Sequence, residues 1–239
     1  MGATNMQNNA YVPWPSKILD VIKHTQKEYT FRMEYVGEVK PGQFFEVSIP
    51  KYGEAPISVS GIGPNFVDLT IRKVGRVTNE VFEKYKGQSL LLRGPYGNGF
   101  DTSLYENGEV IVIAGGTGVS PVRGVIDALA QTKEPKDKHV IVGFRSPDDM
   151  LFRDDLKRWD EKLDLILTVD GAPEGYTGNI GLVTKYIPDV PIRDLETAQA
   201  VVVGPPPMMR FSVMRSMLFA PITPPGIRTR EAVSPLTLE

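Results

Sequence analysis

The chain has 239 residues, of which 41% are hydrophobic and 23% are charged, a composition typical of a folded globular protein with one large domain or two ordinary ones. Its formal net charge of -2 argues against a nucleic-acid partner, which would require clustered Lys and Arg side chains. The absence of cysteine excludes disulfides, thiol nucleophiles and cysteine-ligated iron–sulfur clusters within this sequence.

No apolar stretch approaches the roughly 20 residues that a membrane helix needs, and the Asn-rich start lacks the apolar core of a signal peptide. We therefore expect a cytoplasmic protein without a membrane partner. His24 and His139 lie far apart in the sequence, and neither has the spacing of a metal site or a catalytic triad. We expect both to be structural and predict no metal site.

Short β-like runs separated by turn signals fill the first part of the chain. In Phe66–Ile71, for example, the aliphatic residues Val67, Leu69 and Ile71 alternate with Phe66, Asp68 and Thr70, which is the period of a half-buried strand. This pattern predicts an antiparallel β-barrel over residues 10–102, with one short helix near Thr78–Tyr85. The expected strands are Lys17–Ile22, Tyr29–Tyr35, Gln43–Ile49, Ala55–Gly61, Phe66–Lys73 and Ser89–Arg93.

After about Gly108 apolar strands alternate with helices, which predicts an α/β domain with a parallel sheet over residues 108–218. Two helices should cover this sheet, one with an apolar face on Val122, Val125, Ile126 and Leu129, the other on Phe152, Leu156 and Trp159. The Pro-rich remainder, 219–239, is expected to be extended or poorly ordered. The expected strands are Val110–Ala114, Val140–Phe144, Leu163–Val169 and Ala200–Val203.

A glycine-rich turn directly follows the first of these strands and opens a helix. Glycine permits positive φ and close approach of the backbone to a diphosphate, whose charge is attracted by the helix N-terminus. The alternative is a tight turn without a ligand. The residues predicted to bind a nucleotide here are Gly115, Gly116, Thr117, Gly118 and Pro121.

A second turn, Gly204-Pro205-Pro206-Pro207-Met208, follows the last parallel strand. Because ligands of open α/β sheets bind at the carboxyl ends of the strands, both turns should face one crevice and form one nucleotide site. The alternative is a rigid strand exit.

Taken together, these two turns resemble the nucleotide-binding half of ferredoxin-reductase-like flavoproteins. In the first half, Ala55-Pro56-Ile57-Ser58 and Ile71–Thr78 resemble the two flavin motifs of that family, in the same order, and Arg93–Phe100 resembles its glycine-proline segment. Within the superfamily the likeness is greatest to the flavin subunits of anaerobic sulfite reductase and sulfhydrogenase, which are related to the electron-transfer subunit of dihydroorotate dehydrogenase.

The resemblance implies FAD and either NADH or NADPH as cofactors. It implies that Ser58 hydrogen-bonds the isoalloxazine edge, that Tyr96 stacks near the flavin, and that the segment containing Ile71, Gly75, Val77 and Thr78 holds the diphosphate. The family's diphosphate arginine falls on Ala55, so Arg72, Lys73 or Arg76 must supply that charge. Each residue has a plainer alternative: a strand hydroxyl for Ser58, a packed aromatic for Tyr96, solvated charges for the cations and a helix N-cap for Thr78.

Arg145, after the second parallel strand, could hold the 2′-phosphate of NADPH or be a loop charge, and we expect NADH. The resemblance further implies hydride transfer from nicotinamide to flavin and electron delivery to an iron–sulfur partner subunit. These relatives carry a cysteine-rich cluster segment that this sequence lacks, so we expect neither iron nor acid-labile sulfide in the protein. The alternatives are a degenerate binding or scaffold subunit and a free-standing flavin reductase.

Overall fold

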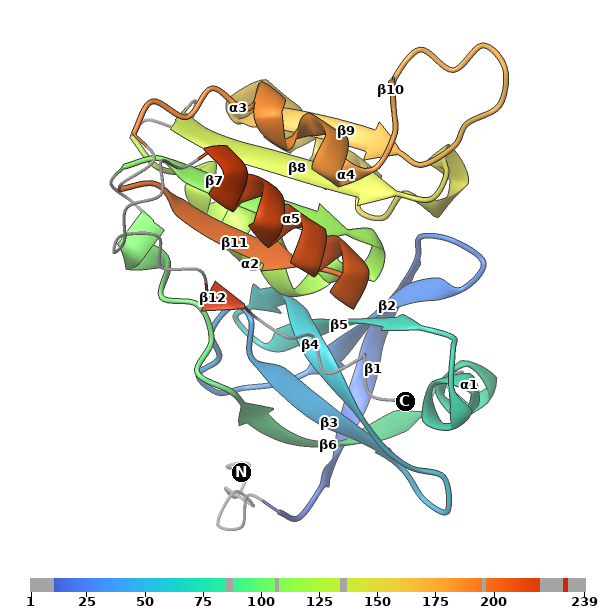
Figure 1. Ribbon diagram of the computed structural model, residues 1–239. Coiled ribbons are helices and arrows are strands. Elements are labelled where there is room, and N and C mark those ends of the chain that lie inside the picture. The colour runs from blue at the N-terminus through green and yellow to red at the C-terminus, as the bar shows by residue number, and fades with distance from the viewer. Residues whose placement is uncertain are drawn as a thin grey trace. The chain divides into compact units, whose positions relative to one another are not determined.

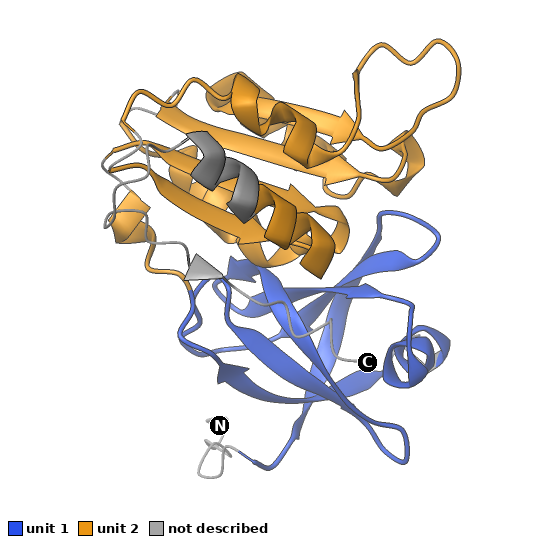
Figure 2. Ribbon diagram, viewed as in Figure 1, with its two compact units in different colours: residues 1–99 blue, residues 100–239 orange. Residues whose placement is uncertain are grey.

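The computed structural model describes residues 11–84, 88–105, 108–133, 137–194, 197–219 and 230–231. The chain divides into two compact units, Met1–Gly99 and Phe100–Glu239 (Figure 2). None of the helices in the described ranges is long and apolar enough to cross a bilayer.

The first unit is a closed antiparallel barrel with the strand order β1-β2-β5-β4-β3-β6 (Figure 1). Alternate side chains point inward, because successive residues of a strand face opposite sides of the sheet. Phe31, Phe45, Ile57 and Leu69 thereby form a core in which none of them is more than 1% exposed. The elements are β1 (Trp14–Lys23), β2 (Glu28–Glu34), β3 (Phe44–Ile49), β4 (Gly53–Gly63), β5 (Phe66–Arg72), α1 (Arg76–Lys84) and β6 (Ser89–Tyr96).

The second unit is a six-stranded sheet with the order β10-β9-β8-β7-β11-β12, in which neighbouring strands are parallel. Its strands are β7 (Val110–Gly115), β8 (Lys138–Phe144), β9 (Asp164–Val169), β10 (Asn179–Ile180), β11 (Gln199–Val203) and β12 (Arg230–Glu231). Its α-helices are α2 (Val119–Leu129), α3 (Arg153–Lys162), α4 (Val183–Tyr186) and α5 (Pro206–Phe219). Its 3-10 turns are η1 (Thr102–Tyr105), η2 (Gly116–Gly118), η4 (Pro147–Asp149) and η5 (Ile187–Asp189).

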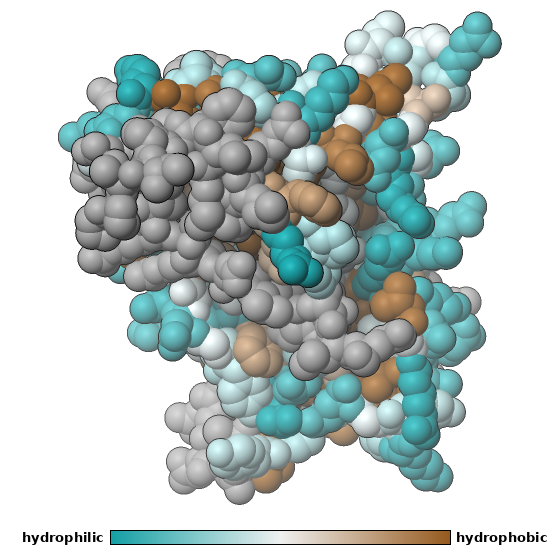
Figure 3. All heavy atoms as spheres, viewed as in Figure 1, coloured by the Kyte–Doolittle hydropathy of each residue, from teal (hydrophilic) through white to brown (hydrophobic). Residues whose placement is uncertain are grey.

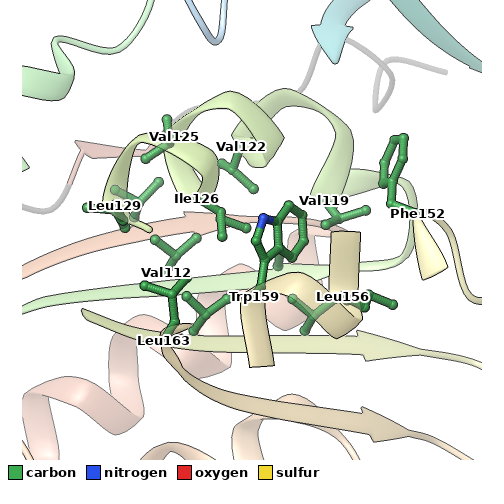
Figure 4. Packing of buried hydrophobic residues seen from close by; sticks show 14 of the residues in the cluster. Val112, Val119, Val122, Val125, Ile126, Leu129, Phe152, Leu156, Trp159 and Leu163 are labelled. Carbon is green, nitrogen blue, oxygen red and sulfur yellow. The ribbon is translucent and has the colours of Figure 1, made fainter. Parts of the chain in front are cut away.

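Helices cover both faces of this sheet. On one face α2 and α3 pack around Trp159, which is fully buried (Figure 4). On the other face α4, η5 and α5 pack on Ile111, Ile113, Ile141 and Val202, with α5 in front of the sheet in Figure 1. Both strand faces are therefore apolar, which explains the unbroken Val and Ile runs of the central strands.

The surface is mixed in character. On the face shown in Figure 3, apolar side chains of the described residues are scattered among polar ones instead of forming one large patch. Single exposed apolar residues of this kind are normal for a folded protein.

The predicted fold class, an antiparallel barrel followed by a parallel α/β domain, is confirmed. The short helix begins at Arg76 instead of Thr78. Phe152 does not lie in the body of a helix, because it is the N-cap of α3 in a left-handed conformation with φ of 52°. The two-residue strands β10 and β12 were not predicted, because they are too short to show a period. β12 falls in the tail expected to be extended, and its Arg230 pairs with Val201; the rest of 220–239 lies outside the described residues.

Candidate functional site

The carboxyl edge of the parallel sheet holds the first predicted turn. β7 ends at Gly115, η2 forms the turn and α2 begins at Val119. Gly116 has φ of 55°, and no atom lies within 4 Å of the position that a Cβ would take there. The turn thus requires glycine for its conformation and leaves open space beside it.

The two glycine turns are in direct contact. A Cβ at Gly118 would lie 2.6 Å from the carbonyl oxygen of Val203 at the end of β11. A Cβ at Gly204 would lie 2.6 Å from Cε of Met208, whose sulfur would also overlap a Cβ at Gly115. The structure therefore brings the two turns together. Met208 packs between them in the first turn of α5, which begins at Pro206 directly after Pro205.

This contact lies at the point where the strand order reverses. From β7 the chain adds β8 and β9 on one side of the sheet, then returns to place β11 on the other side of β7. Helices that follow two such strands leave on opposite faces, which opens a crevice at their carboxyl ends, the usual ligand site of doubly wound sheets. Ser120, in the first turn of α2, is 2% exposed, and its hydroxyl has no hydrogen-bond partner among the described residues.

The loop after β8 carries Arg145 at the same edge. Arg145 is exposed, and its carbonyl accepts a hydrogen bond of 3.1 Å from the amide of Gly171 after β9. Desolvation raises the pKa of Asp170, and the nearby positive charge of Arg145 partly offsets that rise. The hydroxyl of Ser146 donates to Asp149 at 2.6 Å. The cation and the hydroxyl of this loop thus both face carboxylates.

In the barrel, three neighbouring strands place Ser58, Phe44 and Tyr96 in one row. Phe44 of β3 is in register with Ser58 of β4 and with Tyr96 of β6, and the two rings have centroids 5.6 Å apart. Ser58 is 7% exposed. Strand alternation puts Pro56 on the same side, whereas the side chain of Ile57 lies in the barrel core. Only the backbone of Ile57 can face a ligand in this row.

An ion-pair network that was not predicted from the sequence borders this row. Arg93 donates from Nε and Nη2 to Glu54 at 3.0 and 2.5 Å, and from Nη1 to the hydroxyl of Tyr96 at 2.9 Å. Hydrogen bonds from Arg93, and then from Ser48, lower the pKa of Glu54. Arg93 stands in the quoted glycine-proline segment, but its pairing with Glu54 depends on the β3–β4 and β3–β6 registers, which have no local sequence signal.

The segment that resembles the second flavin motif lies at the end of β5 and the start of α1. Ile71 is fully buried in the barrel core. The hydroxyl of Thr78 accepts hydrogen bonds from the amides of Val74 at 3.1 Å and Gly75 at 2.9 Å. Thr78 is therefore not an N-cap: it lies inside the helix and folds back to close the preceding loop. Val77 faces β4, because its Cγ2 lies 3.8 Å from the position of a Cβ at Gly53.

The described residues contain no group of three or more His, Asp or Glu side chains arranged to hold a metal ion. His24 and His139 each have structural partners: His24 hydrogen-bonds Thr30 at 2.8 Å, and His139 hydrogen-bonds Asp164 at 2.7 Å.

Residues 112–214 match the oxidoreductase NAD-binding domain family. The chain is 31% identical over 238 residues to the gamma subunit of sulfhydrogenase 2 from Pyrococcus furiosus, with 90% of this chain and 82% of that protein covered. It is 28% identical over 199 residues to a probable electron-transfer subunit of dihydroorotate dehydrogenase B (NAD(+)) from Thermoplasma volcanium, with 83% of this chain and 71% of that protein covered.

Solved structures share the fold at lower identity. The FAD/NAD-binding domain of a nitric oxide dioxygenase from Vibrio cholerae superposes with a TM-score of 0.77 at 14% identity, covering 93% of this chain and 99% of that one. A ferredoxin NADP+ reductase from Neisseria gonorrhoeae, with bound FAD and NADP, superposes with a TM-score of 0.75 at 17% identity, covering 91% and 98%.

Proposed function

Because this chain belongs to the ferredoxin-reductase-like family of NAD-binding oxidoreductases, alongside sulfhydrogenase gamma subunits, we propose that it is an FAD-dependent electron-transfer subunit. It accepts hydride from NAD(P)H and passes electrons to an iron–sulfur partner. The family predicted from the motifs is thereby confirmed. The iron–sulfur partner is proposed because relatives of this chain are named as subunits of larger enzymes.

The observation that carries the proposal is the contact between the two glycine turns at the switch point of the sheet. Gly118 lies so close to Val203 that the two loops form one continuous backbone surface. Beside it, the open space at Gly116 and the first amides of α2 can receive the pyrophosphate of a dinucleotide. The residues present therefore fit NAD(P)H.

The barrel offers a matching place for the flavin ring. Ser58 carries a hydroxyl in register with the rings of Phe44 and Tyr96, an arrangement that suits a flat heteroaromatic group with polar edges. Arg93 fixes the phenol of Tyr96 through its hydrogen bond, so that the ring has one defined orientation. Bound FAD would supply the hydride acceptance and stepwise electron release, while the protein binds, orients and excludes water.

A visible spectrum of the purified protein tests this function. We expect flavin absorbance after reconstitution with FAD, and bleaching of that absorbance when NADH is added without oxygen. Rapid turnover with small electron acceptors, without any partner subunit, would instead favour a free-standing flavin reductase. A colourless protein that does not bind added FAD would identify a binding or scaffold subunit. The alanine at position 55, where the family has arginine, is the feature that favours this alternative.

Replacing Ser58 by alanine is expected to slow flavin reduction by NADH about tenfold, because one hydrogen bond to the reacting ring is lost. The affinity for FAD should stay within about twofold, since the diphosphate contributes most of the polar contacts. Stopped-flow absorbance measures the first and fluorescence titration the second. Ser89→Ala, at an exposed position on β6, is the matched control. Equal rates in the two variants would remove Ser58 from the site.

NADH is the proposed nicotinamide donor. Arg145 lies near Asp170, and Ser146 donates to Asp149, so a 2′-phosphate would meet carboxylates at this edge of the sheet. We expect kcat/KM with NADH to exceed that with NADPH by about tenfold, which corresponds to one unfavourable charge contact. Steady-state rates with both nucleotides measure this ratio, and equal values would overturn the assignment.

A further inference from the structure

The proposed flavin site needs a positive charge for the FAD diphosphate, and Ala55 does not provide it. Four cationic side chains belong to the motif segments of the barrel. Three of them are already neutralised by carboxylates at ion-pair distance. These pairs are Arg72 with Glu28 (3.1 Å), Lys73 with Glu83 (3.1 Å) and Arg93 with Glu54 (2.5 Å).

Arg72 and Arg93 are poorly suited to a second anion, whereas the pair of Lys73 with Glu83 lies at the surface. Glu28 is 7% exposed and also accepts from the hydroxyl of Thr25, so that pulling Arg72 away would leave a buried carboxylate without its cationic partner. Arg93 also lies near Glu46. Desolvation raises the pKa of Glu46, and the positive charge of Arg93 partly offsets that rise. A diphosphate placed at Arg93 would meet two carboxylates.

Arg76 differs from the other three. Its Nη2 donates to the backbone carbonyl of Lys51 at 3.0 Å, and its guanidinium carbon lies 5.6 Å from the ring centroid of Tyr52. No carboxylate pairs with it among the described residues. A carbonyl and an aromatic ring orient the guanidinium but leave its charge uncompensated.

The location of Arg76 matches the missing charge. It is the first residue of α1, which contacts β3 and β4 (Figure 1). Val77 packs toward Gly53, and Lys51 and Tyr52 form the turn that leads into β4. The guanidinium is therefore held at the beginning of the strand that carries Ala55, beside the first amides of α1.

We propose that Arg76 provides the cation for the flavin diphosphate in place of the arginine that is absent at Ala55. This inference rests on the proposed binding of FAD and assigns it a specific residue. The contacts with Lys51 and Tyr52 hold the side chain in place before the ligand arrives, which reduces the entropy lost on binding.

The test compares FAD with riboflavin, which has the same ring but no phosphate. Binding of each flavin to the full chain is measured by fluorescence quenching for the wild type, Arg76→Gln and Lys73→Gln. Lys73→Gln removes the same charge three positions away, from a side chain already paired with Glu83. We expect Arg76→Gln to weaken FAD binding about tenfold, Lys73→Gln to change it by less than about twofold, and Arg76→Lys to restore most of the loss.

Riboflavin affinity should be the same in all variants, because it has no phosphate to neutralise. An equal loss of FAD affinity in Arg76→Gln and Lys73→Gln would overturn the role of Arg76. A parallel loss of riboflavin affinity in Arg76→Gln would also overturn it, because that loss reports damage to the ring site. A wild-type protein that binds neither flavin would refute the proposed function itself, and this outcome is distinct from both.

Discussion

Gly118→Ala is expected to abolish measurable binding of NADH and to lower the free energy of unfolding by about 1–3 kcal/mol. The added Cβ would lie 2.6 Å from the carbonyl oxygen of Val203 and 2.9 Å from Cα of Gly204. Both atoms belong to the backbone, so the two turns must move apart instead of a side chain turning aside. Because the proposed dinucleotide site is formed by these turns, a shift of this size separates its two halves.

NADH titration and thermal denaturation measure the two effects. Gly171→Ala is the matched control, since Gly171 follows β9 at the same edge of the sheet and no atom lies within 4 Å of its Cβ position. That variant should retain NADH binding and change stability by less than about 0.5 kcal/mol. If Gly118→Ala bound NADH as the wild type does, the contact between the turns would not be the nucleotide site.

Trp159→Ala is expected to destabilise the protein by about 3–5 kcal/mol, the largest stability effect that we predict for a single substitution. The indole is fully buried between α2, α3 and the sheet (Figure 4), and its Nε1 donates to Asp127 at 2.9 Å. Truncation leaves a cavity at the centre of this layer and removes a link between the two helices.

Urea unfolding followed by circular dichroism provides the measurement. Trp159→Phe keeps most of the ring and loses the donor, and Asp127 still accepts from Arg158 at 2.6 Å, so a smaller cost of about 1–2 kcal/mol is expected. Phe211→Ala serves as the control, because that ring is 62% exposed and its loss should cost less than about 0.5 kcal/mol. Similar costs for Trp159→Ala and Phe211→Ala would contradict the burial of Trp159 between the helices and the sheet.

Local patterns in the sequence were sufficient for the class of both units. The two-residue alternation of the barrel strands and the apolar runs of β7, β8 and β11 each reflect the burial of one or both strand faces. The turn at Gly116 could also be predicted locally, because its positive φ requires glycine at that position. Where such patterns are absent, as in the two-residue strands β10 and β12, the sequence predicts no element.

Long-range contacts decided how the candidate site is built. The contact between Gly118 and Val203 joins segments 85 positions apart in the chain, and the pairing of Arg93 with Glu54 spans 39 positions. Neither leaves a local pattern, because each depends on strand order and register. Thr78 closes its own loop and the ring of Tyr96 is fixed by Arg93, roles that depend on hydrogen-bond geometry.

Local sequence patterns were enough to predict that a barrel precedes a nucleotide-type α/β unit, and the family resemblance placed Ala55 at the expected position of the diphosphate arginine. The tertiary structure alone distinguished Arg76 from Arg72 and Lys73. All three are cations within five residues of one another, and only the fold shows that two of them face carboxylates. The physical reason is that the strength of a charge at a site depends on the partners that folding brings to it, and sequence proximity does not specify those partners.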